Sequence, residues 1–334
     1  MTEIPQAATM RAAVRAEYGP PECIEVGHVP RPDPGPGELL VRVRAAAVNP
    51  LDWYVVNGLP LIARASMGMR RPKQLLAGVD LAGVVQAVGS GVTQHQVGDE
   101  VFGGGTGVLA DYALAKEGDV APKPHSLSFE EAAAVPLAGV TALQALRDRG
   151  RLQTGQAVLI NGASGGVGLF AVQIAKHLGA EVTGVCSAGN AELVRSMGAD
   201  QVVDYAAEDF TRAGRRYDLI LDNVGNHPLS ALRRTLMDRG TLLSNSGGGG
   251  GRWFGPFGRI VKVKAAAPFV RQQLIFFLAR VNRADLGQLG EMADAGALKV
   301  AIEGTYRLEE TAAAVRRVGA GHVRGKLVVT VADR

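Results

Sequence analysis

The pattern of hydrophobic and polar positions changes along the chain. Residues 10 to about 120 hold short apolar runs separated by turn residues, as in ELLVRVRAAAV (38–48) and AGVVQAVGSGV (82–92). Such runs predict β-strands. From 156 to 246, strand-length apolar runs alternate with longer amphipathic segments, and we predict strands at 157–161, 181–185, 201–203, 218–222 and 241–245. Alternating strands and helices are typical of an α/β fold with a parallel, doubly wound sheet.

Four further signals lie outside this alternation. Ser128, followed three residues later by Glu131, forms a capping-box pattern that predicts the start of a helix. Helical periodicity returns at 284–295 and 308–318, and KLVVTV at 326–331 predicts a last strand. The segment 247–281 carries much of the aromatic content. It could line an apolar pocket, cover one as a lid, or form a subunit interface.

A glycine-rich turn follows the first strand of the alternating region. Gly162, Gly165 and Gly168 recur at three-residue intervals directly after AVLIN, and an amphipathic helical stretch comes next. One glycine permits the tight turn, a second lets backbone N–H groups approach a pyrophosphate, and a third lets the helix pack on the strand. The helix N-terminus adds partial positive charge. The sequence therefore predicts a dinucleotide-binding site here.

The end of the second strand of this region bears on the choice of dinucleotide. NAD-binding units usually place Asp or Glu there, about 20 residues past the glycines, to bind the ribose 2′-OH. This sequence has Ser187, followed by Ala188 and Gly189. A serine can donate a hydrogen bond to a 2′-phosphate, and no carboxylate is present to repel one. We therefore predict NADPH as the cofactor.

Length, charge and cysteine content narrow the class of protein. The 334 residues are enough for about two domains. The net charge is only +4, and the Lys and Arg residues are scattered among acidic residues, which argues against nucleic-acid binding. The two cysteines, Cys23 and Cys186, do not suggest a secreted disulfide framework. We find no signal peptide and no apolar stretch long enough for a membrane span, so we expect a cytoplasmic protein without a membrane partner.

With these motifs in place, the chain resembles the zinc-independent medium-chain dehydrogenases/reductases. The resemblance is to the quinone oxidoreductases and the related reticulon-interacting mitochondrial reductases. It rests on AAAVNPLDWYVVNG, LAGVDLAGVVQAVGSGV, VGDEVFG, EEAAAVPLAGVTALQAL, NGASGGVG, YDLILDNVG and GHVRGKLVV. It implies a GroES-like, β-rich catalytic domain over 1–127, completed by about 285–334, with a Rossmann NADPH-binding domain inserted at 128–284. We also expect a homodimer.

The resemblance further implies a reaction without a metal ion. Zinc-dependent relatives bind a catalytic metal with Cys, His and a carboxylate. The matching positions here are Asn49 in AVNPLD and the stretch GVD at 78–80. Because both cysteines lie far from these motifs, we expect no metal site.

Two residues in the N-terminal region are candidates for catalysis. Tyr54, in LDWYVVNG, aligns with a tyrosine suspected as proton donor or substrate-positioning residue in quinone-reductase relatives. A phenol can hydrogen-bond the oxygen that gains charge as hydride arrives; alternatively, Tyr54 packs against the cleft wall. Asn49 could orient substrate or nicotinamide through its amide, or belong to a structural turn before Pro50. We expect Asp52 to cap a helix and Asp80 to make a fold-stabilising hydrogen bond.

The resemblance also implies a set of cofactor contacts. At the pyrophosphate, beside the three loop glycines, it places Ser164, Gly166 and Val167. It places Ser187 and Tyr205 at the adenosine ribose phosphate, and Asn223 and Phe277 near the nicotinamide. In the return segment GHVRGK it places His322, Val323 and Arg324 on the cofactor. Arg324 and Lys326 could alternatively be ordinary surface charges.

These observations lead to two hypotheses of different classes. The first is a zinc-independent, NADPH-dependent oxidoreductase that transfers hydride to an activated C=C or C=O of an apolar small molecule, such as a quinone, enone or aldehyde. The second is an NADPH-binding protein with a mainly structural or regulatory role. The fold alone does not separate them.

Overall fold

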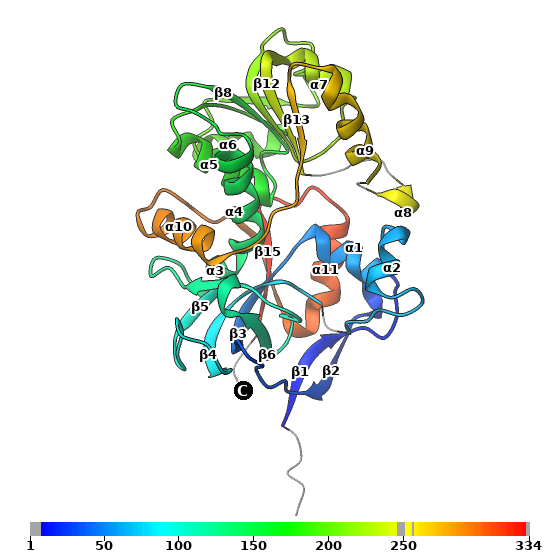
Figure 1. The fold of residues 1–334 in the computed structure, drawn as a ribbon, viewed down its shortest axis with the longest axis vertical. Coiled ribbons are helices and arrows are strands. Elements are labelled where there is room, and N and C mark those ends of the chain that lie inside the picture. The colour runs from blue at the N-terminus through cyan, green and yellow to red at the C-terminus, as the bar shows by residue number, and fades with distance from the viewer. Residues whose placement is uncertain (1–7, 76, 246–250, 256, 332–334) are drawn as a thin grey trace, which may run out of the picture.

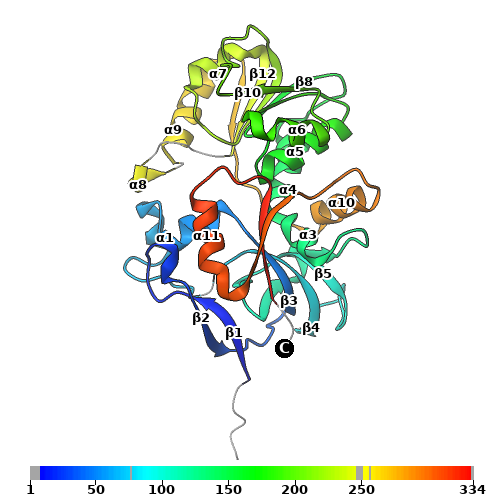
Figure 2. The same ribbon diagram turned by 180° about the vertical axis from the view of Figure 1, so that it is seen from behind.

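Two β-sheets organise the molecule, which we describe from a computed structural model (Figures 1 and 2). The structure describes residues 8–75, 77–245, 251–255 and 257–331. One sheet and its helices form the upper lobe in Figure 1, and the other sheet forms the lower lobe. Helix α4 (Pro136–Leu143) lies between the lobes. The fold is α/β, as the sequence predicts.

The upper sheet is parallel. In the described part of the chain it holds six strands in the order β10-β9-β8-β11-β12-β13, so the chain crosses from one half to the other after β10. A doubly wound sheet places its ligand site at such a crossing. The strands are β8 (Ala157–Asn161), β9 (Glu181–Cys186), β10 (Gln201–Asp204), β11 (Tyr217–Asp222), β12 (Leu236–Ser244) and β13 (Gln273–Phe276).

The first five of these strands confirm the predicted alternation, and β13 was not predicted. It lies inside the aromatic segment 247–281, after helix α9 (Phe257–Ala266), and pairs in parallel with β12. Its four residues are an edge strand, too short for a periodicity of two to stand out. Part of that segment is therefore a component of the sheet.

Helices cover both faces of the parallel sheet. Helix α5 (Gly166–His177) buries a continuous apolar face, including Phe170 and Ile174, against β8, β9 and α4. The capping box at Ser128 is confirmed: its side chain accepts from the Glu131 N–H at the start of α3 (Phe129–Ala134). Helices α6 (Ala191–Ser196) and α7 (Leu229–Thr235) also belong to this lobe, whereas α3 packs on the lower sheet and α8 (Gly251–Phe254) contacts residues 61–63 of the lower lobe.

The lower sheet combines segments from both ends of the sequence. Strand β15 (Lys326–Thr330) lies between β14 (Ile302–Arg307), with which it is parallel, and the long β3 (Glu38–Val48), with which it is antiparallel. The other strands paired in this sheet are β4 (Asp80–Val88), β5 (Glu100–Gly104), β6 (Tyr112–Lys116) and β7 (Val120–Pro122). Residues far apart in the sequence thus meet beside β3.

Besides α3, the lower lobe is completed by a small hairpin and four further helices. The hairpin pairs β1 (Thr9–Val14) with β2 (Glu25–Pro30). The helices are α1 (Pro50–Asn57), α2 (Arg64–Met67), α10 (Arg283–Asp294) and α11 (Thr311–Gly319). Helix α11 packs on α1, and α10 packs on β7 and α4. Among the described residues, no helix is long and apolar enough to cross a membrane.

Candidate functional site

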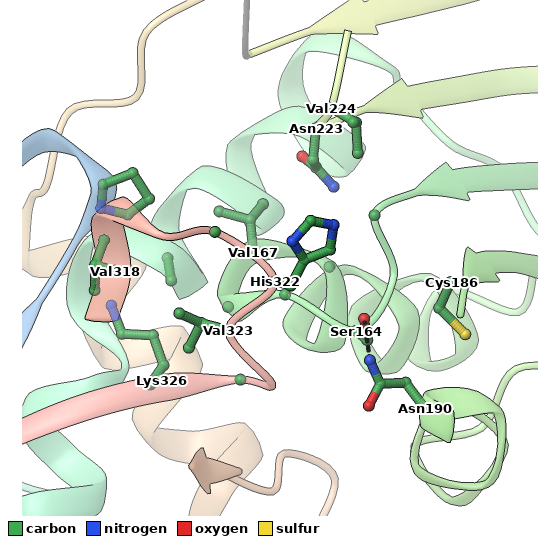
Figure 3. Close-up of a pocket in the computed structure, with 18 of the residues that line it drawn as sticks. Ser164, Val167, Cys186, Asn190, Asn223, Val224, Val318, His322, Val323 and Lys326 are labelled. Carbon is green, nitrogen blue, oxygen red and sulfur yellow. Dashed lines mark hydrogen bonds between the residues drawn. The ribbon is translucent and has the colours of Figure 1, made fainter. Parts of the chain in front are cut away.

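A cavity of about 610 Å³ lies where the two lobes meet. Its walls come from the turn after β8, the ends of β9 and β11, the start of α1, and the segment that leads into β15 (Figure 3). These segments lie at the carboxyl edge of the parallel sheet, where doubly wound folds bind ligands. Most of the residues implied by the sequence as cofactor contacts line it: Gly162, Ser164, Gly165, Gly166, Val167, Gly168, Ser187, Tyr205, Asn223, His322 and Val323.

The glycines of the turn have different structural roles. Gly162 has φ +79°, a conformation that favours glycine, and a Cβ atom at Gly168 would overlap the carbonyl oxygen of Gly162. A Cβ atom at Gly165 would meet only that same oxygen, at 3.6 Å. Gly165 is also the N-cap of α5 and lines the cavity. Open space beside a helix N-terminus suits a phosphate group.

Polar side chains gather beyond the end of β9. The Asn190 amide Nδ2 donates to the hydroxyl oxygens of Ser164 and Ser187, both at 3.2 Å, and so connects the glycine turn to the second strand. Tyr205, just after β10, lines the same side of the cavity and is 49% exposed. No carboxylate is among the described residues that line the cavity.

Asn223 presents an unsatisfied amide to the cavity. Its Nδ2 and Oδ1 atoms are buried, and neither has a hydrogen-bond partner among the described residues. The loop that carries it is held by Asp222, whose carboxylate accepts from the Gly225 N–H at 2.9 Å and from Asn161 Nδ2 at 2.9 Å. Buried amides are normally hydrogen-bonded. The orientation of Asn223 in Figure 3 therefore suits a bound ligand with its own donor and acceptor.

The segment before β15 closes on the glycine turn. The Gly325 N–H donates to the Ser164 carbonyl oxygen at 2.9 Å, and His322 adopts φ +56° and lines the cavity. On the outer side, the Arg317 guanidinium donates to the Gly321 and His322 carbonyl oxygens and pairs with Glu303. The side chain of Arg324 is exposed, does not line the cavity, and its N–H donates to Glu303.

A cluster of buried polar groups lies at the end of the cavity that faces the lower sheet. The Asn49 amide Nδ2 donates to Asp80 Oδ2 at 2.9 Å, and its Oδ1 accepts from the Lys326 ammonium. Asp80 also accepts from the Leu137 N–H at 3.1 Å, and its Oδ2 lies 3.8 Å from Lys326 Nζ. Asp52 accepts from the Asn49 N–H at 2.7 Å. Only Asn49 and Lys326 of these residues line the cavity.

Burial controls the charges in this cluster. It raises the pKa of Asp52 to about 7, and neighbouring Asp80 adds to this rise. It also raises the pKa of Asp80 and lowers that of Lys326, while each partner's charge opposes the shift of the other. Asp80 accepts two N–H donors with its two oxygens, which favours its ionised form. We infer an Asp80–Lys326 ion pair, with Asp52 as the group that titrates near neutral pH.

Three residues implied by the sequence as site residues lie elsewhere. Tyr54 is half-buried in α1, in edge-to-face contact with Trp53, and is not among the residues lining the cavity. Phe277 is 6% exposed and packs in the hydrophobic core. Arg324 is on the surface, as described above. Among the described residues, no three His, Cys, Asp or Glu side chains form a group that could hold a metal ion.

Two residues of the site were not recognised from the sequence. For Lys326 the sequence leaves open a cofactor role or an ordinary surface charge, and the structure excludes the surface charge: the residue is 4% exposed, because β15 lies in the interior of the lower sheet. Its place at the start of the apolar run KLVVTV was a signal of burial. Asn190 was missed because its role depends on a contact with Ser164, 26 residues away. Its position directly after the end of the second strand could have marked it.

The cavity fits a nicotinamide dinucleotide. The open face at Gly165 and the N-terminus of α5 would hold the pyrophosphate, and Ser187, Asn190 and Tyr205 would surround the adenosine ribose. The unpaired amide of Asn223 provides a donor and an acceptor farther along the cavity. When bound, this cofactor supplies a hydride.

Two family models match the chain. The Alcohol dehydrogenase GroES-like domain matches residues 35–125, and the Zinc-binding dehydrogenase model matches residues 197–329. The first covers most of the lower sheet. The second covers β10–β13 and continues through β15.

Individual relatives match over nearly the whole chain. The mouse mitochondrial NAD(P)H oxidoreductase RTN4IP1 is 35% identical, covering 89% of this chain and 82% of that protein. The structure of the quinone oxidoreductase from Coxiella burnetii is 30% identical, with a TM-score of 0.83 and coverage of 97% and 100%. The mycobacterial protein Rv1454c, solved in complex with NADPH, is 28% identical, with a TM-score of 0.81 and coverage of 96% and 99%. The chain therefore belongs to the medium-chain dehydrogenase/reductase family, in its quinone-oxidoreductase branch, and is an oxidoreductase.

Proposed function

We propose that this oxidoreductase uses NADPH to transfer a hydride to an activated C=C or C=O bond of an apolar small molecule. The observation that carries the proposal is the continuity of the cavity. It runs from a glycine turn suited to phosphates to a buried polar cluster on the lower sheet. Binding both reactants in one enclosed space sets their reacting atoms at short distance, which is much of what such an enzyme must supply.

The substrate end of the cavity supports an apolar reactant. Near Asn49 and Lys326 the walls are made of Val48, Pro50, Ala138, Val318 and Leu327. Such walls favour a quinone, an enone or an aldehyde over a charged metabolite. The experiment is a panel of these three classes, with NADPH oxidation followed by absorbance. Turnover with none of them would favour an NADPH-binding protein with a structural or regulatory role.

Replacing Gly165 with alanine tests the cofactor site. The backbone there has φ −80°, which alanine adopts, and a Cβ has room, so folding should change by less than about 0.5 kcal/mol. The new methyl group would occupy the space proposed for the pyrophosphate. We expect NADPH affinity to fall about tenfold or more, or at least about 1.4 kcal/mol, in a fluorescence titration.

Gly118→Ala is the matched control for this change. A Cβ there would have no atom within 4 Å, and Gly118 is outside the cavity walls. Its NADPH affinity should equal that of the wild type. Unchanged NADPH affinity in Gly165→Ala would place the phosphates elsewhere.

Preference for NADPH over NADH is part of the proposal and rests on Ser187. A Ser187→Asp substitution should weaken NADPH binding about tenfold and bring NADH closer to it, because a carboxylate repels a 2′-phosphate and accepts from a 2′-OH. Parallel titrations with both cofactors measure this. Ser196→Asp, on the exposed face of α6, adds the same charge away from the cavity and should leave both affinities unchanged. Equal affinity of the wild type for both cofactors would contradict the proposal.

Several sequence predictions remain predictions. They are the homodimer, the cytoplasmic location, the domain bounds, and the catalytic role of Tyr54.

A further inference from the structure

The only Lys or Arg side chain among the described residues that line the cavity is Lys326. It is 4% exposed, and its aliphatic part passes beneath the glycine turn, where a Cβ atom at Gly166 would lie 2.8 Å from Lys326 Cδ. A buried ammonium is costly unless it is paired and hydrogen-bonded. A buried ammonium group in the wall of a cavity is therefore a candidate for a role in binding or catalysis.

The ammonium group has donors to spare. It carries three N–H bonds, and among the described residues Asn49 Oδ1 is the one acceptor in a hydrogen bond with it. Asp80 Oδ2, at 3.8 Å, compensates the charge at a separation beyond direct hydrogen bonding. At least one N–H bond is thus available to an oxygen atom of a bound molecule.

Lys326 lies on the side of the cavity away from Asn190. In Figure 3, Lys326 and Asn190 lie on opposite sides, with the glycine turn and His322 between them. If the adenosine half of the cofactor lies beside Ser187 and Asn190, its pyrophosphate at Gly165 directs the nicotinamide half toward the side of Lys326. The ammonium then faces the place where a substrate receives the hydride.

The surroundings favour a strong charge-assisted hydrogen bond. Val318 of α11 and Pro50 at the start of α1 are apolar neighbours along this wall, and a low local dielectric strengthens the interaction with an anionic oxygen. The titratable groups that face Lys326 are Asp80 at the start of β4 and Asp52 in α1. The Asn49 amide forms hydrogen bonds with both Lys326 and Asp80 and so fixes the position of one side chain relative to the other.

We propose that Lys326 is a catalytic residue that donates a hydrogen bond, and then a proton, to the substrate oxygen that becomes negatively charged. The proposal rests on the proposed function, in which a nicotinamide dinucleotide is the reductant. For an enone, hydride bonds to the β-carbon, the C=C electron pair moves to form a Cα=C bond, and the carbonyl electron pair moves onto oxygen. Lys326 Nζ gives its proton to that oxygen, forming an enol that tautomerises in water. The neutral amine regains a proton from water when product leaves.

Asn49 is a positioning residue in this scheme. Both ends of its amide are bonded within the protein, to Asp80 and Lys326, so it orients the ammonium. Tyr54, the candidate from the sequence, is outside the cavity walls. The two residues therefore give opposite expectations for the same kinetic measurement.

The first experiment compares variants with the most active substrate of the panel. Lys326→Met, which keeps the length of the side chain, should lower kcat by roughly 100- to 1,000-fold, as for the loss of one donor to a developing oxyanion. Because Lys326 also lines the cofactor cavity, kcat is compared at saturating NADPH, and the NADPH affinity of each variant is measured separately by fluorescence titration. Tyr54→Phe should stay within about threefold of wild-type kcat.

A second variant guards against misfolding. Lys326→Met leaves Asp80 buried without its counter-charge, so the double variant Lys326→Met/Asp80→Asn removes both charges. It also lacks the ammonium and should lose kcat to the same extent. A folded double variant that binds NADPH and retains kcat near wild type would overturn the proposal. So would a large loss in Tyr54→Phe with none in Lys326→Met.

A second readout does not depend on turnover. 4-Nitrophenol can present a phenolate oxygen in place of the substrate oxygen, and its ionised form is yellow. With oxidised NADP bound, the wild type should lower the apparent pKa of the bound phenol by at least one unit, or about tenfold in its ionisation constant. The double variant should not. An equal pKa in both proteins, or no lowering in the wild type, would count against Lys326.

The two readouts separate this inference from the proposed function. If the wild type oxidises no NADPH with any of the panel, the proposed function fails. A Lys326-dependent ionisation of the phenol would still establish an oxyanion site at this wall. If turnover occurs and neither readout responds to Lys326, the proposed function stands and the inference fails.

Discussion

Asp80→Ala is expected to lower the free energy of unfolding by about 3–5 kcal/mol, because it leaves the Lys326 ammonium buried without its counter-charge. Asp80 is 0% exposed, lies 3.8 Å from Lys326 Nζ, and accepts from Asn49 Nδ2 and the Leu137 N–H. Urea unfolding followed by circular dichroism measures the change.

The double variant Asp80→Ala/Lys326→Met identifies the cause. It removes the unpaired ammonium and should recover much of the lost stability, while the Leu137 N–H left without an acceptor keeps a cost of about 1–3 kcal/mol. Asp238→Ala is the matched control: this aspartate pairs with Arg216 at the surface, with 85% of its side chain exposed, and should change stability by less than about 1 kcal/mol. A double variant as unstable as Asp80→Ala would rule out the buried charge as the cause.

Asp52→Asn should alter the pH dependence of stability. The pKa of Asp52 is raised to about 7 in the folded protein, against about 3.9 when unfolded, so the folded state binds its proton more tightly. That contribution is complete below the unfolded pKa and is lost as pH rises through about 7. Asparagine does not titrate and keeps an acceptor for the Asn49 N–H. Relative to wild type, the variant should gain up to roughly 4 kcal/mol between pH 4 and 8.

Unfolding curves at several pH values, recorded side by side, test this expectation. The other carboxylates titrate alike in both proteins, so the difference between the two isolates Asp52. The difference should change most steeply between pH 4 and 7 and level off above. Parallel stability curves across this range would mean that Asp52 is ionised in the folded protein throughout.

The elements predicted well are those specified by neighbouring residues. The glycine turn and the strands around it are adjacent in sequence, and the spacing of Gly162, Gly165 and Gly168 is itself the geometric requirement of the turn. The capping box of Ser128 and Glu131 is equally local. Each of these signals lies within a single turn or helix end, so no tertiary information is needed to interpret it.

The features that escaped prediction depend on contacts between distant segments. Lys326 and Asn49 are 277 residues apart, and only the pairing of β15 with β3 brings them together. Tyr54 lies in α1, whose N-cap is Asn49, and its motif alone does not specify which face of the helix lines the cavity, so its catalytic role remains a prediction. Phe277 follows an edge strand, and its packing in the core depends on how the chain leaves that strand.

The interior position of β15 has a consequence for synthesis of the protein on the ribosome. On one side of β3, Glu38–Arg42 pair with β6, but Ala45–Val48 have no partner there until β15 is made. At about 5–20 residues per second, the 277 residues between Asn49 and Lys326 take on the order of 15–60 s to translate. During that interval the short unpaired edge Ala45–Val48 is open to pairing with other nascent chains. We expect chains that end just before residue 326 to keep this edge exposed and to aggregate more readily than the full chain.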